Sequence, residues 1–428
     1  MKIQLAFGQH GLDVTLPETA NPTVIRKPEM PVADNGRSAV LHALSNPLGS
    51  EPLAQLASEA QSACILICDI TRPVPNHLFL RPLIEQLISA GVPKSGISIV
   101  VATGLHRPNL GDEMEELLGD SWVSQNVQVE NHYARNDQDC VHLGITEKHH
   151  VPVGLNKTFV NADIKIATGL VEPHFMAGYS GGRKVIAPGV AHHETIRTFH
   201  SARFMESPFA TSCNLENNPL HETQLEIVQM LNGPVLSLNT VIDEHRNLAF
   251  VSFGEAIESH MAAVEFARAS CEVQVGRKFK TVLTSSAGYP LDKTYYQTVK
   301  GMVTPLDILE DGGDLIIVSE CSEGFGSDEF LAAQKKLVTL GTEAFLQSLL
   351  DKNLADIDEW QTEMQLKPMR VGKIKLYAPK LAEDVVSFTG VEMIDNVNTA
   401  IAQSLSQQGS AEMAVIPEGP YVVPFAAV

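Results

Sequence analysis

The sequence predicts an α/β protein of two domains, each built on a largely parallel sheet with flanking helices. The first observation is a repeated pattern, in which short β-branched runs are followed by segments of helical period. The second is that this alternation restarts at about residue 280. The third is length, since 428 residues are enough for two or three domains with sizeable cores.

The first half of the chain supplies one set of alternating elements. It opens with the apolar run Ala63-Cys-Ile-Leu-Ile-Cys68, which is typical of a buried strand where cysteine acts as a small apolar residue. We expect strands over residues 63–70, 97–102 and 163–168, and helices over 76–90, 111–118, 193–205, 221–231 and 255–269.

The second half repeats the pattern and is long enough to form its own doubly wound sheet. We expect strands over residues 281–285, 314–319, 373–377, 391–394 and 413–416, and helices over 295–303, 328–350, 379–387 and 397–407. The domain boundary is therefore placed between residues 275 and 276, giving domains 1–275 and 276–428. The apolar tail after Pro417 is expected to pack back on a domain surface.

Charge and targeting signals limit the classes of function. The chain has 51 acidic and 31 basic residues, a net charge of −20, and no block of lysine and arginine. Nucleic acids and anionic membranes are therefore unlikely partners by charge repulsion, and we expect neither. The first ten residues lack the apolar stretch of a signal peptide, and no apolar run approaches the roughly 18 residues of a membrane helix. We expect a cytoplasmic protein. Six cysteines without a C-x-x-C pair predict no disulfide framework.

Polar residues follow three of the predicted strands. The first strand ends in Asp69-Ile-Thr-Arg-Pro-Val-Pro75, the second in Thr103-Gly-Leu-His106-Arg-Pro108, and the third in a segment that contains His174. Prolines prevent an immediate helix after the first two strands. Because ligands bind at the carboxyl ends of parallel strands, we expect Arg72, His106 and His174 to meet at one edge of the sheet. Each histidine alone would more often be structural.

The segment Gly178-Tyr-Ser-Gly-Gly-Arg-Lys184-Val-Ile-Ala-Pro-Gly189 is unusual in its glycine content. Its glycines, including Gly181 and Gly182, allow close backbone approach to a ligand and predict a phosphate cradle. It is not a Walker A loop, because Arg183 replaces the second glycine and Val185 follows the lysine. The alternatives are a flexible turn with a solvated Arg-Lys pair, or a lysine that acts as a covalent anchor or Schiff-base nucleophile.

Three further positions are possible ligands or substrate contacts. His200 lies on the helix expected over residues 193–205 and could bind a metal ion. His192 and His193 cannot share a helix face, and the chain has neither H-E-x-x-H nor a Cys-His set, so a zinc triad is not indicated. Gln297 and Lys300 are spaced i, i+3 at a helix start, either as a surface pair or reaching a carboxylate.

Together these segments resemble the nickel-pincer lactate racemases, a family of 2-hydroxy-acid racemases and epimerases, over essentially the whole chain. The matching segments are Asp69-Ile-Thr-Arg-Pro-Val-Pro, Thr103-Gly-Leu-His-Arg-Pro, Glu172-Pro-His-Phe, Gly178-Tyr-Ser-Gly-Gly-Arg-Lys, Phe199-His-Ser-Ala-Arg and Tyr296-Gln-Thr-Val-Lys.

The resemblance implies a cofactor and a place for it. The family encloses a pyridinium-3-thioamide-5-thiocarboxylic acid mononucleotide in the cleft between two α/β domains. This nucleotide holds nickel through sulfur, carbon, sulfur and one histidine nitrogen. By resemblance, domain 1–275 would bind the cofactor and carry the catalytic groups, and domain 276–428 would close over the substrate. Accessory enzymes that synthesise the cofactor are the implied partners.

The resemblance also implies roles for individual residues. Lys184 would form the thioamide link and His200 would be the nickel ligand. His106 and His174 would be the acid/base pair. The remaining implied contacts are Arg72, Lys300, Gln297, Tyr296 and Trp360 with the substrate, and Asp69, Thr71, Gly181 and Gly182 with the cofactor.

The implied reaction is inversion of a short 2-hydroxy acid by hydride transfer, with lactate as the first substrate. A carboxylate stabilises an α-carbanion poorly, whereas hydride removal gives a flat keto acid, so a cofactor must accept the hydride. One histidine would take the hydroxyl proton and the other would return a proton on the opposite face. Arg72 would grip the carboxylate in two bonds and Lys300 would add a point charge. Domain closure would exclude water.

Other functions remain open at this stage. Malate, aromatic 2-hydroxy acids and sugar acids are alternative substrates, because Arg107, Arg183 and Arg203 could supply a further cation. A different class is a nucleotide- or nickel-binding protein without turnover, which would not need two histidines on separate strand ends. A metal hydrolase would need an open metal site with an activated water rather than a lysine anchor.

Overall fold

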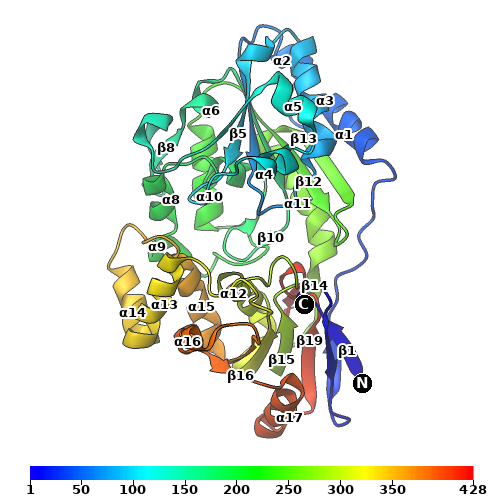
Figure 1. The fold of residues 1–428 in the computed structure, drawn as a ribbon, viewed down its shortest axis with the longest axis vertical. Coiled ribbons are helices and arrows are strands. Elements are labelled where there is room, and N and C mark those ends of the chain that lie inside the picture. The colour runs from blue at the N-terminus through cyan, green and yellow to red at the C-terminus, as the bar shows by residue number, and fades with distance from the viewer. Residues whose placement is uncertain (428) are drawn as a thin grey trace. The chain divides into compact units, whose positions relative to one another are not determined.

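The computed structural model describes residues 1–427 and divides into two compact units (Figure 1). The N-terminal unit consists of Glu29–Phe199 and Pro208–Ser270. The C-terminal unit consists of Met1–Pro28, His200–Ser207 and the chain from Cys271 onward. The chain therefore passes between the two units several times rather than dividing at one point in the sequence.

The N-terminal unit is built on a six-stranded sheet. Its strands, in spatial order, are β13 (Leu248–Glu255), β12 (Val235–Ile242), β9 (Ile164–Leu170), β4 (Ala63–Cys68), β5 (Ile97–Ala102) and β6 (Gln128–Asn131). Every neighbouring pair is parallel except β12–β13. The predicted strands over residues 63–70, 97–102 and 163–168 are thus confirmed as three neighbouring strands inside the sheet, β4, β5 and β9.

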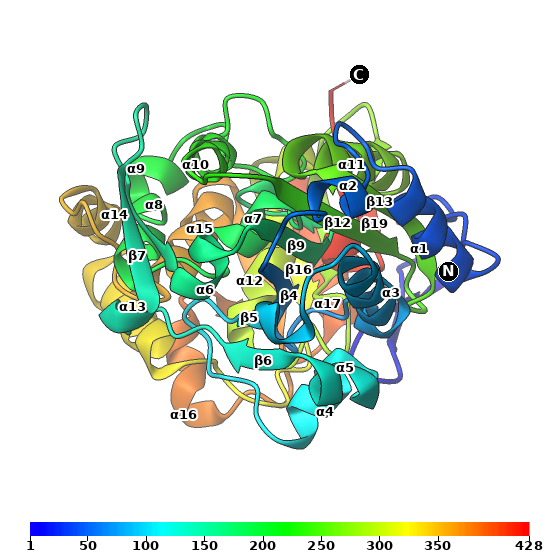
Figure 2. The same cartoon turned by 90° about the horizontal axis from the view of Figure 1, so that it is seen from above.

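Helices cover both faces of this sheet (Figure 2). Helices α1 (Gly36–Ser45) and α3 (Asn76–Ser89) pack on one face, against residues such as Ile65 and Ile166. Helices α7 (Arg183–Ile186) and α11 (Ala256–Cys271) pack on the other, where Gly169 faces α7 and Ser237 hydrogen-bonds to Ser259. Further helices of the unit are α2 (Leu53–Leu56), α4 (Asp112–Leu118), α5 (Ser121–Asn126), α6 (Lys157–Asn161), α8 (His193–Phe199) and α10 (Pro219–Gln229).

The C-terminal unit has a second six-stranded sheet, in which all neighbouring strands are parallel. Its order is β18 (Glu392–Met393), β17 (Lys373–Tyr377), β16 (Leu309–Val318), β15 (Phe279–Ser285), β19 (Glu412–Ile416) and β3 (Asn21–Val24). Helix α17 (Val397–Gln408) and the hairpin of β1 (Lys2–Leu5) and β2 (Leu12–Thr15) pack on the face of Ile316. Helix α12 (Tyr295–Val303) packs on the opposite face, where Gly301 approaches Ile317. The predicted two-domain α/β class is confirmed.

Several elements differ from the sequence prediction. The single helix expected over residues 193–205 is two helices, α8 and α9 (Ala202–Met205), because Ser201 is extended between them. Helix α15 (Glu359–Val371) was not predicted, and the helix expected over residues 379–387 is the single turn α16 (Glu383–Val386). The pair α13 (Asp328–Leu340) and α14 (Thr342–Leu350) is confirmed.

Short sheets complete the structure. They are β7 (Cys140–Ile145) with β8 (Pro152–Asn156), β10 (Pro173–His174) with β11 (Gly178–Tyr179), and β14 (Glu272–Gln274) with β20 (Val423–Phe425). The last of these pairs the C-terminal tail with the segment that follows α11. None of the helices formed by residues 1–427 combines the length and the apolar character that crossing a membrane requires.

Candidate functional site

The carboxyl ends of β9, β4 and β5 carry the polar residues of the N-terminal unit. These three strands are neighbours and run parallel, so their carboxyl ends lie at the same edge. Asp69 and Arg72 follow β4, His106 follows β5, and His174 lies in β10 just after β9. The topology therefore delivers Arg72, His106 and His174 from adjacent strand ends.

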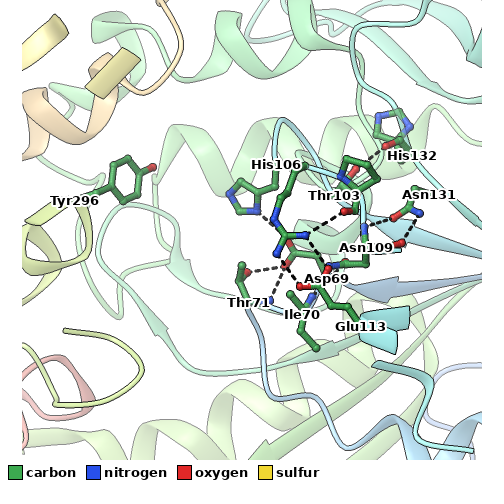
Figure 3. A network of polar contacts seen from close by, with 12 residues as sticks. Asp69, Ile70, Thr71, Thr103, His106, Asn109, Glu113, Asn131, His132 and Tyr296 are labelled. Carbon is green, nitrogen blue, oxygen red and sulfur yellow. Dashed lines mark hydrogen bonds and ion pairs between the residues drawn. The ribbon is translucent and has the colours of Figure 1, made fainter. Parts of the chain in front are cut away.

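Asp69 and His106 form a short hydrogen bond (Figure 3). The Oδ2 atom of Asp69 lies 2.6 Å from Nδ1 of His106, and Oδ1 accepts from the Thr71 hydroxyl at 2.6 Å. Burial by itself would raise the pKa of Asp69, but the hydrogen bonds from His106 and Thr71 and the Arg72 charge lower it overall. Asp69 is therefore an ionised acceptor.

This pairing determines which nitrogen of His106 can exchange a proton. A carboxylate only accepts hydrogen bonds, so the Nδ1 atom of His106 carries the hydrogen and donates it to Asp69. In the neutral ring, Nε2 then has a lone pair. The His106 side chain is 61% exposed, whereas that of Asp69 is 7% exposed. The buried carboxylate thus orients an accessible imidazole as a base, as in other His-carboxylate pairs.

The loop that carries His106 is held by its own network (Figure 3). The side chain of Asn109 accepts from the backbone N–H of Ile70 at 3.4 Å, and the backbone N–H of Asn109 donates to Asn131 at 2.9 Å. Glu113 accepts two hydrogen bonds from Arg107, both at 2.7 Å, and one from Asn109. The Arg107 guanidinium is therefore already paired with Glu113.

His174 has the opposite hydrogen-bond pattern. It is 8% exposed, and its Nδ1 atom accepts from the backbone N–H groups of Met176 and Ala177 at 3.4 and 3.2 Å. An accepting Nδ1 places the hydrogen of the neutral ring on Nε2. His174 is therefore held as an Nε2–H donor, whereas His106 is held with an Nε2 lone pair.

Arg72 interacts with an acid and acts on a lysine through its charge. Its Nε atom is 3.7 Å from Oε1 of Glu172, an ion pair in which both side chains are partly exposed. Its charge also acts on Lys184, the first residue after Arg183 in α7. Sequence reasoning quoted Glu172 only as part of a motif and assigned it no role.

Lys184 is a lysine with a strongly perturbed pKa. Burial, followed by the charges of Arg72 and Arg183, lowers the pKa of Lys184 to about 7. The neutral amine is thus well populated near neutral pH, which is what a nucleophilic or covalently attached lysine requires.

Arg183 is not a solvated partner of this lysine. It is 2% exposed, and its guanidinium contacts His221 at 2.7 Å, His260 at 2.9 Å and the carbonyls of Ala177 and Tyr179. Burial lowers the pKa of Arg183 to about 9, and burial with the Arg183 charge lowers the pKa of His221 to about 3. The interpretation as a solvated Arg-Lys pair is therefore wrong, and Arg183 is committed to fixing the turn before Lys184.

The two glycines before Arg183 are held tightly by the protein itself. Gly181 and Gly182 both have positive φ, and an added Cβ would meet Val171 at 2.5 Å and the His260 ring at 2.8 Å. The backbone N–H of Gly182 donates to the side chain of Asn239 at 2.9 Å. Contact between these glycines and a phosphate stays a prediction.

The remaining predicted site residues belong to the C-terminal unit. Gln297 and Lys300 lie one turn apart on α12, and both are partly exposed. The Oε1 atom of Gln297 is buried and has no hydrogen-bond partner among the described residues. The hydroxyl of Tyr296 donates to Asp358 at 3.4 Å.

His200 lies between α8 and α9 and not on a helix as expected. It is 7% exposed, and its ring centroid is 4.9 Å from that of Trp360, which begins the first turn of α15 with Glu359. The structure thus brings His200 and Trp360 together, two residues separated by 160 positions that sequence reasoning linked only by resemblance.

Comparison with known proteins finds one family over most of the chain. Family models match the lactate racemase N-terminal domain over residues 7–212 and the lactate racemase C-terminal domain over residues 276–423. A protein named lactate racemase from Thermoanaerobacterium thermosaccharolyticum is 30% identical over 427 residues, covering 98% of each chain. One of the same name from Lactiplantibacillus plantarum is 28% identical over 389 residues, covering 90% of this chain and 89% of that protein.

A solved structure gives the same result. The lactate racemase apoprotein from Thermoanaerobacterium thermosaccharolyticum matches with a TM-score of 0.90 and 29% identity, covering 99% of this chain and 100% of that one.

Proposed function

The chain belongs to the lactate racemase family, and on that premise we propose that it interconverts the D and L enantiomers of a short 2-hydroxy acid, with lactate as the first substrate. The observation that carries this proposal is the pairing of Asp69 with His106, which prepares an accessible histidine as a base, while a second histidine after another strand of the same sheet is held as a donor. A binding protein without turnover has no need of such a pair.

Lys184 and His200 fit the nickel-pincer nucleotide by their chemistry. We propose that the amine of Lys184 forms the thioamide link, since a neutral amine is the reactive form and its pKa is lowered to about 7. Buried imidazole is a suitable nickel ligand, and His200 is buried beside Trp360. When bound, this nucleotide supplies the hydride acceptor for the reaction. Enzymes that synthesise it are the proposed partners.

The two histidines handle the hydroxyl proton. The Nε2 lone pair of His106 accepts the proton from the substrate hydroxyl, and Asp69 stabilises the positive ring that results. On the other face, Nε2–H of His174 hydrogen-bonds to the oxygen of the keto acid. The ring passes a proton to that oxygen from its protonated form, in which Nδ1 also carries a hydrogen, and a neutral imidazole remains. Exchange with water between turnovers removes the proton from His106 and returns one to His174. For the opposite enantiomer the two rings exchange roles, as a racemase must serve both directions.

Cationic and amide groups would hold the substrate. Arg72 offers the planar fork that binds a carboxylate in two bonds, in place of its longer contact with Glu172. Lys300 adds a point charge, and the unpartnered Oε1 atom of Gln297 is an acceptor for a substrate hydroxyl. Tyr296 and Trp360 are proposed to line the substrate site.

The attachment site is tested by intact-mass spectrometry. The chain is produced together with the cofactor-synthesising enzymes, as wild type, as Lys184→Ala, and as Lys278→Ala, a matched change at an exposed lysine. We expect a nickel-containing adduct on the wild type and on Lys278→Ala, and none on Lys184→Ala. An adduct that persists on Lys184→Ala would contradict the assignment.

The reaction is tested with lactate deuterated at C2. Hydride transfer within a closed site predicts inverted product that keeps most of its deuterium, whereas α-proton exchange predicts loss of the label to water. Chiral chromatography with mass detection reads both configuration and label. Complete washout would overturn the hydride mechanism, and absence of any inversion by cofactor-loaded protein would overturn the racemase proposal.

A further inference from the structure

A group of possible metal ligands lies in the N-terminal unit and does not include His200. Asp137, His192 and His193 each offer one ligand atom, and these atoms all lie within 4.8 Å of one another. Asp137 belongs to the 3₁₀ turn Asp137–Asp139, which the two histidines approach from the start of α8. The ring of His142 in β7 adds a third imidazole, with its centroid 5.5 Å from that of His192.

The sequence did not predict a metal site at His192 and His193. Neighbouring residues on a helix point in different directions, so His192 and His193 were not expected to act together. The helix-face argument does not apply to this pair, because α8 begins at His193 and the backbone at His192 is not helical. Their ring centroids are 4.3 Å apart.

The backbone fixes both histidines. The N–H of His192 donates to the carbonyl of Gly154, and the N–H of His193 donates to the carbonyl of Ala134, both at 2.8 Å. Gly154 also provides the space, since a Cβ there would lie 2.8 Å from Cβ of His192 and 3.4 Å from Nδ1 of His142. Two separate segments of the chain, at Ala134 and Gly154, thus fix the backbone from which both imidazoles project.

The ligand atoms are in suitable forms. Nε2 of His192 lies 2.8 Å from Oδ1 of Asp137, and the hydrogen bond from His192 lowers the pKa of Asp137, so its carboxylate is ionised. The charge of Arg197 reaches His193 and opposes a cation, and the Asp137 carboxylate offsets it. The Asp137 side chain is 80% exposed, so it can rotate to close the group around an ion.

We propose that Asp137, His192 and His193 bind a divalent first-row transition-metal ion, for which Zn²⁺ is the best match, with water in the fourth position. Two imidazoles and one carboxylate are a ligand set that Zn²⁺ binds at about 2.1 Å, which places the ligand atoms of a tetrahedral site about 3.4 Å from one another. The three ligand atoms already lie within 4.8 Å of one another, and rotation of the exposed Asp137 side chain would bring them closer.

The proton balance of this site is simple. In the metal-free state the backbone N–H of Glu194 donates to Nδ1 of His192 at 3.3 Å, so the proton of the neutral ring is on Nε2 and is shared with Asp137. The ion takes the place of that proton, which moves to Nδ1, and the long hydrogen bond from Glu194 is lost. No proton is released. The ion would then join the Asp137–Asp139 turn to the start of α8, the helix whose end leads directly to His200.

The test is Zn²⁺ titration of the full chain, stripped with a chelator and made without the cofactor-synthesising enzymes, in competition with a chromophoric chelator. The test variants are Asp137→Asn and His193→Ala, which spare the buried His192. His245→Ala, in an exposed turn, is the matched control, and His200→Ala separates this site from the proposed nickel ligand. Co²⁺ in place of Zn²⁺ gives a visible absorption band from the same ligands.

We expect one Zn²⁺ per chain in the wild type, His245→Ala and His200→Ala, and affinity weaker by about tenfold or more in Asp137→Asn and His193→Ala. The Co²⁺ band should weaken in the same two variants. Unchanged affinity in both variants, loss of the bound ion in His200→Ala alone, or no binding by the wild type would each overturn the proposal. None of these results depends on racemase activity.

Discussion

Raising the pH should convert Lys184 from ammonium to amine with a midpoint near 7, well below the ordinary value of 10.5. The cause is mainly burial, with smaller effects from the charges of Arg72 and Arg183. The sign follows from this cause, because burial and neighbouring cations both disfavour the charged form of an amine.

The size of the effect makes it measurable. At pH 7 about half of the Lys184 side chains would be neutral, against about 3 in 10,000 for an amine with a pKa of 10.5, a difference of roughly 1,500-fold. Only the neutral amine reacts with an acylating reagent. Lys184 should therefore react at a pH where a lysine with the ordinary pKa of 10.5 hardly reacts.

Brief acetylation at a series of pH values, followed by peptide mass spectrometry, measures the fraction of Lys184 that is a reactive, neutral amine. The chain is prepared without the cofactor-synthesising enzymes so that the amine is not modified, and the exposed Lys2 serves as the internal reference for the reagent. Because access also affects the rate, the midpoint of the pH profile and not its height is the quantity to compare.

Arg72→Gln provides the matched perturbation. It removes the neighbouring charge with the larger effect, so the midpoint for Lys184 should move upward from about 7 towards 10.5. Glu113→Gln, a change at an acid paired with Arg107, should leave the midpoint where it is. A wild-type midpoint near 10.5 would refute the reasoning, and an unchanged midpoint in Arg72→Gln would exclude the charge contribution.

Three further predictions, with four substitutions, test other parts of the structure. His106→Ala and His174→Ala should each reduce turnover of both enantiomers by about 10²- to 10⁴-fold in cofactor-loaded protein, and a loss in one direction only would contradict paired roles. Arg72→Lys should raise KM and lower kcat in steady-state assays, because a point charge cannot bind a carboxylate in two bonds; unchanged constants would exclude that contact. Asp314→Asn should lower the free energy of unfolding in urea by about 3–5 kcal/mol, because it leaves buried Lys375 without its acid at 3.3 Å; a change within error would contradict this.

Much of the fold could be predicted because its signals are local. The central strands of both sheets are β-branched runs that need no knowledge of their neighbours. The alternating segment Val235–Ile242 carried the same signal and could have been found. Helix α15 could not, because its buried residues include Gln361, Thr362 and Glu363 and it shows no apolar stripe.

The pairing of segments that lie far apart in the chain could not be predicted from the sequence. Strand β3 pairs with β19 in the C-terminal sheet although almost the whole chain separates them, and no pattern within Asn21–Val24 indicates that partner. The burial of Arg183 could not be predicted for a similar reason. Its two histidine partners, His221 and His260, come from distant helices, and an Arg-Lys pair after glycines is more often solvated.

The two histidines of the proposed site, His106 and His174, are held in different resting tautomers. A short bond of 2.6 Å to an ionised carboxylate holds His106, whereas two longer bonds of 3.2 and 3.4 Å from backbone N–H groups hold His174. A racemase must run in both directions, so Nε2 of His174 has to accept a proton in one of them, which requires that Nε2 first lose its hydrogen and that Nδ1 carry one. A hydrogen on Nδ1 displaces the two long bonds from the N–H groups of Met176 and Ala177. The weaker contacts are thus on the histidine that must change its tautomer, while the stronger contact holds the one whose resting form is already that of a base.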